Sequence, residues 1–230
     1  MKTIIISDLH NRVDWIEPFL SSVEYDKVIF LGDYFDDFND TSRDVKRSAK
    51  WLKQSLKIPN RIHLFGTHDL WYRFPFNRYL QASGNTGKKL DVINTILTEK
   101  DWKLLKFYHF EQTFLLTHAG LHSSFVSNND PISSLDSLLF EALIEIKDGE
   151  ISPILDAGFA RGGINPFGGI TWLDWHDEFE PVPYLNQIVG HTQLKHPQEF
   201  SINNSKNYCI DTKNKYIGIL ENNQLSTPDR

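Results

Sequence analysis

Short hydrophobic runs alternate with amphipathic segments through the first 65 residues. The runs Lys2–Ser7, Lys27–Leu31 and Arg61–Phe65 are short and largely apolar, which is typical of buried strands. Between them, Val13–Val23 and Thr41–Leu56 carry apolar residues at helical spacing, so we expect an amphipathic helix in each. The order strand, helix, strand, helix, strand predicts parallel strands that are joined by right-handed crossovers.

The rest of the chain mixes helical periodicity with short strands. Helices are expected at Lys88–Thr98 and Ser133–Ile146, and Lys106–Leu116 predicts a hairpin. Further short strands are expected at Gln187–Val189, Tyr208–Asp211 and Tyr216–Leu220, with turns at residues 213–215 and 222–223. This pattern favours two sheets that pack face to face with helices outside. Because no Pro-, Gly- or Ser-rich linker divides the chain, we expect a single domain over residues 1–230.

Five of the predicted strands end in Asp or His, in most cases beside a glycine. The segments are Asp8-Leu9-His10, Gly32-Asp33-Tyr34-Phe35-Asp36-Asp37, Gly66-Thr67-His68-Asp69, Thr117-His118-Ala119-Gly120 and Gly190-His191-Thr192. The carboxyl ends of strands form the ligand crevice in α/β sheets, and glycine lets the backbone approach a ligand there. Each segment alone is an ordinary turn or helix cap, but five of them in succession indicate one site.

Carboxylates and imidazoles together suit divalent cations such as Mn, Fe or Zn. Two such cations, about 3.5–4 Å apart, form the usual clamp for phosphoester hydrolysis. One carboxylate must then bridge them, and each cation needs further ligands from other strands. The residues that can supply this set are Asp8, His10, Asp33, His118 and His191.

These segments resemble the motifs of the calcineurin-like metallophosphoesterase superfamily, which read D-x-H, G-D-x-x-D, G-N-H-[E/D], a lone His and G-H. The spacing is similar to that of the protein Ser/Thr phosphatase and symmetrical diadenosine tetraphosphatase branch. Gln193 after Gly190-His191, and the run Cys209–Thr212, fit that branch. The resemblance spans residues 3–221 and implies an α/β fold, a four-layer α/β/β/α sandwich of two mixed sheets flanked by helices.

The resemblance also implies an activity and a ligand for each metal. The expected enzyme hydrolyses a phosphomonoester or a nucleotide-type pyrophosphate through a hydroxide held by two divalent ions, Mn first, with Fe or Zn as alternatives. Asp8 and His10 would bind the first ion, and Asp33 would bridge both. The ligands of the second ion would be Thr67, His118 and His191.

The remaining implied roles concern proton transfer and substrate binding. His68 would be the general acid that protonates the leaving oxygen, and Asp36 would orient it. Arg161, in a Gly-rich segment, and Arg73, five residues after His68, are candidates for binding the substrate phosphate. The alternative for each arginine is a solvated surface position. The expected partner is a phosphorylated substrate, which is a phosphoprotein, a nucleotide or a small phosphoester.

Three positions depart from the family pattern and keep a second function open. Thr67 stands in place of Asn, Asp37 in place of a phosphate-binding Arg, and Asn11 in place of Gly. A weaker second metal site and a repelled phosphate would make the chain a degenerate binding or regulatory module. The acid pair argues for an enzyme, because a binding module has no use for a positioned acid. A nuclease is disfavoured by Gln193, which replaces a second imidazole.

The aromatic segment Gly162–Pro183 has two interpretations. Trp172, Trp175, Phe167 and Phe179 can form a lid or substrate wall, or they can close a second small core.

Composition limits partners and location. The chain has 230 residues, 40% of them hydrophobic, and a net charge of −6, so duplex nucleic acid held through its phosphates is not expected. The single cysteine, Cys209, excludes an intramolecular disulfide and a Cys-based zinc site, and fits a reducing compartment. No apolar run is long enough for a signal peptide or a membrane span, so we expect a cytoplasmic protein without membrane association.

Overall fold

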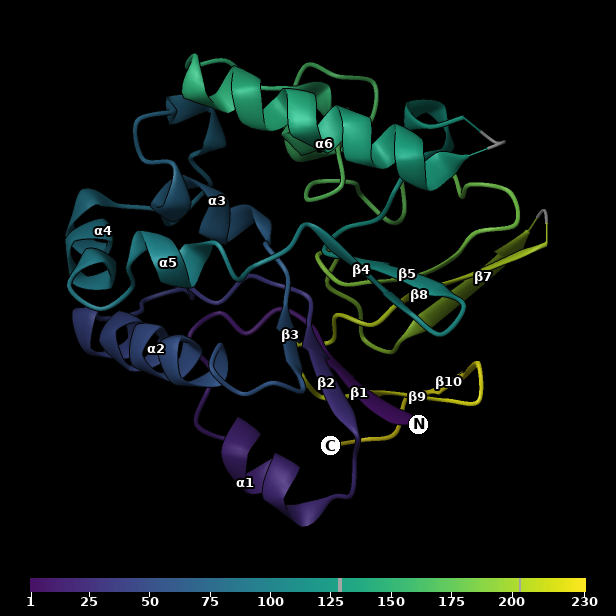
Figure 1. Cartoon of the computed structure of the whole chain (residues 1–230), viewed down its shortest axis with the longest axis horizontal. Coiled ribbons are helices and arrows are strands. Elements are labelled where there is room, and N and C mark those ends of the chain that lie inside the picture. The colour runs from purple at the N-terminus through teal and green to yellow at the C-terminus, as the bar shows by residue number, and fades with distance from the viewer. Residues whose placement is uncertain (128–129, 203) are drawn as a thin grey trace.

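The computed structural model describes residues 1–127, 130–202 and 204–230, and within them ten strands form two five-stranded sheets (Figure 1). The first sheet contains, in spatial order, β10 (Gln224–Ser226), β9 (Gly218–Glu221), β1 (Lys2–Ile6), β2 (Lys27–Phe30) and β3 (Arg61–His63). The second contains β4 (Tyr108–Glu111), β5 (Phe114–Thr117), β6 (Asn186–Val189), β8 (Ser205–Cys209) and β7 (Gln198–Ile202).

Both sheets are mixed: the parallel strands form one side of the first sheet and the centre of the second. β1 pairs in parallel with β2, and β2 with β3, as the order of strands and helices predicts. β5 pairs in parallel with β6, and β6 with β8. An antiparallel neighbour, β9, lies beside β1 in the first sheet, and two lie on either side of the parallel strands in the second: the hairpin partner β4 beside β5, and β7 beside β8. The carboxyl ends of the parallel strands therefore meet at one end of the sandwich.

Alternation along the strands divides the core into layers. Ile4 and Ile6 of β1 pack with Ile16 and Leu20 of α1 (Ile16–Ser22), whereas Ile5 faces the second sheet. The helix α2 (Ser42–Ser55) also covers the first sheet, and α6 (Pro131–Lys147) covers the second (Figure 1). The predicted four-layer α/β/β/α sandwich is confirmed.

Helix boundaries follow their caps. Thr41 caps α2 through a capping box with Asp44, as expected, and Pro18 lies in the first turn of α1. The helix expected over Lys88–Thr98 is shorter in the structure, where α4 spans Gly87–Asn94. Thr98 has an extended backbone and caps the next helix, α5 (Glu99–Trp102).

Among the α-helices and strands of the described residues, α3 (Thr67–Arg73), α5 and β7 lie outside the predicted set. Both helices are too short to show a helical period, and all five residues of β7 are exposed, which removes the alternation that marks a half-buried strand. The expected strands near the C-terminus exist as β8 and β9, but they lie in different sheets. The turn at residues 213–215 is therefore a connection between sheets and not a hairpin.

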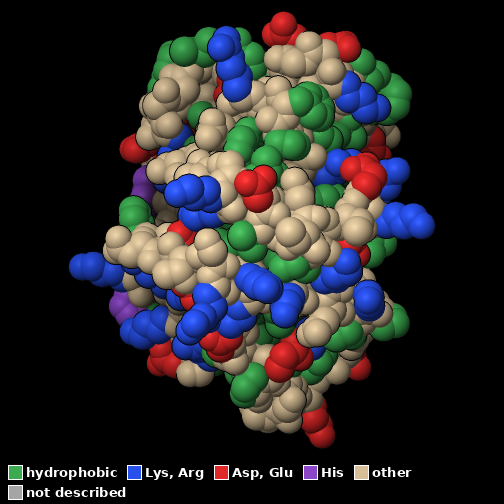
Figure 2. All heavy atoms as spheres, turned by 90° about the vertical axis from the view of Figure 1, so that its left-hand side faces the viewer, with side chains coloured by type: hydrophobic (Ala, Val, Ile, Leu, Met, Phe, Trp, Pro, Cys, Tyr) green, Lys and Arg blue, Asp and Glu red, His purple; other side chains and the backbone are tan. Residues whose placement is uncertain are grey.

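The face that carries α2 is rich in basic side chains, although the chain is acidic overall (Figure 2). Arg43, Lys46 and Lys50 are exposed on this helix, opposite its buried apolar stripe. The amphipathic pattern of this segment therefore reflects one buried and one solvated face. Of the helices in the described part of the chain, none combines the length and the apolar character that crossing a bilayer requires.

Candidate metal centre

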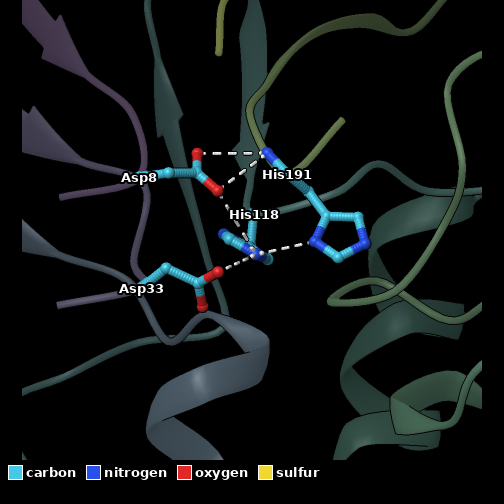
Figure 3. A group of neighbouring side chains, drawn as sticks. All are labelled: Asp8, Asp33, His118 and His191. Atoms are coloured by element: carbon cyan, nitrogen blue, oxygen red, sulfur yellow. Dashed lines mark hydrogen bonds and ion pairs between the residues drawn. The ribbon is translucent and has the colours of Figure 1, made fainter. Parts of the chain in front are cut away.

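Side chains from four strand ends meet between the two sheets. The segments that follow β1, β2, β5 and β6 bring four groups together with ligand atoms within 4.8 Å of one another: Asp8, Asp33, His118 and His191. Figure 3 shows these side chains pointing toward a common point. A second group lies within the same distance limit and consists of His10, Asp33 and His68. Asp33 belongs to both groups, which is the position expected of a bridging carboxylate.

Two glycines make this convergence possible. A Cβ atom on Gly66 would lie 2.2 Å from Asp33 Oδ1, and one on Gly190 would lie 2.3 Å from Asp8 Oδ2. Both distances are far below van der Waals contact, so any side chain there would displace a carboxylate. The glycines beside Asp33 and Asp8 therefore allow close backbone approach, as the sequence indicates.

Four of the site residues adopt a left-handed backbone conformation: His10, Asp33, Asp36 and His191, with φ between 43° and 65°. This region costs a residue other than glycine about 1–3 kcal/mol. Hydrogen bonds hold the turns in place. The backbone N–H of His191 donates to Asp8 at 3.1 Å, and the N–H of Asp33 donates to Asp69 at 2.8 Å. The unfavourable backbone conformation thus occurs at residues whose side chains must point toward one centre.

Backbone carbonyls fix the orientation of two imidazoles. His118 donates its Nδ1–H to the carbonyl oxygen of Leu31 at 2.8 Å, so Nε2 faces the centre, 3.4 Å from Asp33 Oδ2. His10 directs Nδ1 at the carbonyl oxygens of Phe35 and Asp36 and places Nε2 3.6 Å from Asp33 Oδ2. Hydrogen bonding on the far nitrogen is the usual way in which a protein sets the tautomer of a metal-binding histidine.

The electrostatics of the centre favour a cation. Burial raises the pKa of Asp33, but the imidazoles of His118 and His68 outweigh it and hold this pKa well below its usual range. Burial lowers the pKa of His118, yet Asp33 and Asp8 raise it to about 10. Burial and the neighbouring His118 lower the pKa of His191. The carboxylates thus demand a positive charge, which a proton or a metal can supply.

The donor set fits a divalent cation. Two buried carboxylates and the imidazoles of His118 and His191 approach one another, with His118 Nε2 3.2 Å from His191 Nδ1. Two imidazole nitrogens at this distance from each other and from carboxylates make a ligand set that suits Mn, Fe or Zn. How Asp8 and His10 divide between two ions stays a prediction, because Asp8 groups with His118 and His191, and His10 with His68.

Thr67 lies against the shared carboxylate. It is the first residue of α3, it is buried, and its hydroxyl lies 3.3 Å from both oxygens of Asp33. The hydroxyl donates toward Asp33 and leaves its lone pairs for another partner. The structure therefore brings Thr67 to the centre, and its role as a ligand stays a prediction.

His68 and Asp36, for which the sequence predicts the role of an acid pair, contact each other beside this centre. His68 Nδ1 lies 3.3 Å from Asp36 Oδ2. Burial lowers the pKa of His68, but Asp33 and Asp36 outweigh it and raise the pKa above its ordinary value. Burial raises the pKa of Asp36, whereas hydrogen bonds from His68 and Lys89 outweigh it and lower the pKa. The pair therefore couples an ionised carboxylate to an imidazole that readily carries a proton.

A family comparison decides the class of the protein. The model of the calcineurin-like phosphoesterase family matches residues 1–215, which is nearly the whole chain. The chain belongs to the calcineurin-like phosphoesterase family. A search of curated proteins finds no match.

Solved structures support the fold of this family member. A cold-active protein-tyrosine phosphatase of a Shewanella species aligns over 99% of this chain and 77% of its own, at 17% identity and a TM-score of 0.59. A protein serine/threonine phosphatase of Saccharomyces cerevisiae aligns over 100% of this chain and 80% of its own, at 13% identity and a TM-score of 0.57. At these identities the likeness shows the shared fold alone.

The candidate metal centre opens into a cavity of about 300 Å³. Its lining includes His10, His68, His191, Arg12, Arg161 and Gln193. Arg161 Nη2 pairs with Asp174 at 2.8 Å and donates to Thr192 at 3.0 Å. Arg73 lies elsewhere: Glu99 holds its guanidinium, which lies over the ring of Phe74. Of the two predicted arginines, the structure brings only Arg161 to the cavity.

Two departures from the family pattern acquire partners. Asp37 pairs with Arg12 at 3.1 Å, so its charge is compensated within the cavity wall. Asn11 adopts a φ of 62°, a conformation that Asn tolerates better than most residues, and donates to Asp40 Oδ2 at 2.7 Å. Sequence reasoning missed Arg12, although it follows the first predicted motif by only two residues.

The aromatic segment contributes two of its rings to a small core. Trp175 and Phe179 pack with Val189 and Leu194 in a small core. Trp172 meets the ring of His191 edge to face at 5.9 Å. The small core is confirmed for Trp175 and Phe179, and a lid or substrate wall stays a prediction.

Proposed function

We propose that this phosphoesterase is a metal-dependent phosphatase, a phosphoric ester hydrolase, that cleaves a phosphomonoester or a nucleotide-type pyrophosphate in the cavity. One observation carries the proposal: Asp33 lies between two groups of ligand atoms, Asp8, His118 and His191 on one side and His10 and His68 on the other, and His68 also contacts Asp36. This arrangement supports a pair of ions on one phosphate and an acid next to its leaving group.

The residues that would hold the ions are Asp8, His10, Asp33, Thr67, His118 and His191. When bound, two divalent ions, Mn²⁺ in first place and Fe or Zn as alternatives, neutralise phosphate charge and lower the pKa of a bound water. The location that we propose is the cytoplasm, where the buried free thiol of Cys209 stays reduced.

The protein's own groups complete the reaction. Asp36 accepts from His68 Nδ1–H and leaves Nε2–H for the substrate. As hydroxide forms a bond to phosphorus and the bond to the leaving oxygen breaks, the Nε2 proton passes to that oxygen. Arg161 and Arg12 line the cavity and can bind the phosphate oxygens, because a guanidinium donates in a fork that matches two oxygens.

Turnover of 4-nitrophenyl phosphate tests the proposal. Metal-stripped protein should be inactive and gain activity with Mn²⁺, and Asp33→Asn should abolish it. Asp148→Asn, an exposed position at the end of α6, is the matched control and should behave like the wild type. Absence of turnover in the wild type, or equal turnover in Asp33→Asn, would refute the proposal.

The alternative is a binding or regulatory module that hydrolyses little. The contact of the Thr67 hydroxyl with Asp33, in place of an amide ligand, favours it. The same titration separates the two functions, because a module would bind Mn²⁺ and phosphate without turnover, and Thr67→Asn would restore hydrolysis.

A further inference from the structure

Helix α4 places one lysine against the acid pair. Lys89 Nζ lies 2.8 Å from Asp36 Oδ1 and 2.7 Å from Asp40 Oδ1, and its side chain is 14% exposed. Asp40 in turn accepts from Asn11 Nδ2 at 2.7 Å. The contacts form a continuous chain from Asn11 through Asp40, Lys89 and Asp36 to His68. None of the family motifs contains Lys89 or Asp40.

The two oxygens of Asp36 have separate partners. Oδ1 accepts from Lys89 and from the hydroxyl of Tyr72 at 2.7 Å. Oδ2 faces His68 Nδ1 and accepts from the side-chain amide of Asn85. A carboxylate with donors on both oxygens cannot rotate without losing hydrogen bonds, so Oδ2 stays directed at the imidazole.

The surrounding backbone also closes on Asp36. Gly84 has a φ of +90°, and a Cβ on it would lie 3.2 Å from Asp36 Cβ. Asn85 Nδ2 additionally donates to the carbonyl oxygen of His68 at 3.2 Å. The segment that leads into α4 therefore contacts both Asp36 and His68. A partly buried ammonium between two buried carboxylates is weak evidence for a role in stability, because the desolvation of the charges offsets their attraction.

We propose that Lys89 is a positioning residue for the general acid: it fixes Asp36 so that His68 directs its Nε2 proton at the leaving oxygen. The inference rests on the proposed phosphoesterase function. It predicts that Lys89 affects proton delivery and leaves the binding of metal and phosphate unchanged. A purely structural lysine, which only anchors α4, would instead affect every step alike.

The basicity of the leaving group separates these roles. 4-Nitrophenolate leaves as a stable anion and needs little help from an acid, whereas phenolate is more basic and depends on the proton. Lys89→Met should therefore lower kcat for phenyl phosphate by about tenfold, a partial loss of what an acid contributes, while kcat for 4-nitrophenyl phosphate stays within about twofold. KM should stay constant for both substrates.

Matched variants complete the test. Lys88→Met removes the exposed neighbouring lysine and should change neither rate. Lys89→Arg keeps a cation near both carboxylates and should recover most of the lost rate. In an Asp36→Asn background, Lys89→Met should have no further effect, because the two residues act through one contact. Calorimetry of Mn²⁺ binding should give the same stoichiometry and affinity for wild type and Lys89→Met.

The outcomes are distinguishable. A wild type that hydrolyses neither ester refutes the proposed function and the inference with it. A wild type that hydrolyses 4-nitrophenyl phosphate, with both esters slowed equally or not at all by Lys89→Met, refutes the inference alone. If Lys89→Met does not fold, Asp40→Asn, which removes one of the two carboxylates that hold Lys89, should show the same selective loss to a smaller degree, and equal losses would refute the inference.

Discussion

Asp69 Oδ2 accepts a hydrogen bond from the backbone N–H of Asp33 at 2.8 Å. The same carboxylate accepts from the N–H groups of Tyr34 at 3.0 Å and Gly66 at 2.9 Å, and it is completely buried. Asp69 thus ties the turn after β2, with its left-handed Asp33, to the turn after β3. This contact therefore sets the direction of the Asp33 side chain, which would bridge two metal ions.

Replacing Asp69 should therefore lower the free energy of unfolding of the protein. Asp69→Ala leaves three buried N–H groups without acceptors, which we expect to cost about 3–5 kcal/mol of unfolding free energy. Urea denaturation of the metal-stripped protein measures it. Asp101→Ala, which removes an acceptor at the exposed N-terminus of α5, is the control and should cost about 1 kcal/mol. Equal losses would contradict this account of Asp69.

Thr67→Asn should strengthen the weaker metal site. An amide oxygen is a better neutral ligand than a hydroxyl that already donates to Asp33. We expect the weaker of two Mn²⁺ dissociation constants to fall by about tenfold, the scale on which single groups near a metal act. Titration calorimetry measures the constants. If Thr67→Asn instead lowers the smaller dissociation constant and leaves the larger one unchanged, Thr67 belongs to the tighter of the two sites.

The arginines of the cavity should differ from Arg73 in their effect on substrate binding. Arg161→Gln and Arg12→Gln each remove a charged donor from the cavity wall, so KM for 4-nitrophenyl phosphate should rise about tenfold. Arg73→Gln loses a pair with Glu99 and a contact with the ring of Phe74, both outside the cavity lining, and should leave KM unchanged. Steady-state kinetics on the three variants checks this. A larger rise in Arg73→Gln than in Arg161→Gln would reverse the assignment.

His63 gives the fold an acid sensitivity that is independent of the metal site. It is buried between Ser55 and Tyr34, and burial, with a further contribution from Arg61, lowers its pKa from 6.5 to about 3. The folded protein keeps it neutral, so its stabilising contribution is complete above pH 6.5. This contribution declines as the pH falls toward 3, because only the unfolded chain takes up the proton.

The loss at pH 5 should reach roughly 2 kcal/mol relative to pH 7. His63→Gln removes the pH-dependent contribution of His63 to the unfolding free energy. The unfolding free energies of wild type and variant should therefore converge as the pH falls from 7 to 5. Both proteins are measured without metal, so that the other titrating groups contribute equally to the two curves and cancel in their difference. Parallel curves over this range would show that His63 titrates alike in both states.

The convergence of the candidate metal ligands was predictable because each follows a hydrophobic strand closely. Asp8, Asp33 and His118 follow parallel or central strands whose carboxyl ends must meet, so chain order alone places them together. The layers of the fold were predictable for a similar reason, since the apolar strands must be covered on both faces. Local pattern and topology agree for these residues.

The residues that hold Asp36 beside His68 carry no such signal in the sequence. Lys89, Asn85 and Tyr72 reach Asp36 across 36 to 53 positions of sequence, from segments without a motif. Arg73 and Tyr72 are neighbours on α3, yet only Tyr72 turns toward the site. A seven-residue helix is too short for its pattern to show which side faces the cavity. Contacts of this kind are fixed by tertiary packing.

The stoichiometry of Mn²⁺ binding tests the central claim most directly. Titration of the metal-stripped protein should show two ions per chain, and Asp33→Asn, which replaces the carboxylate shared by both ligand groups, should bind one at most. Binding of no ion by the wild type, or of equal numbers by wild type and Asp33→Asn, would contradict the account.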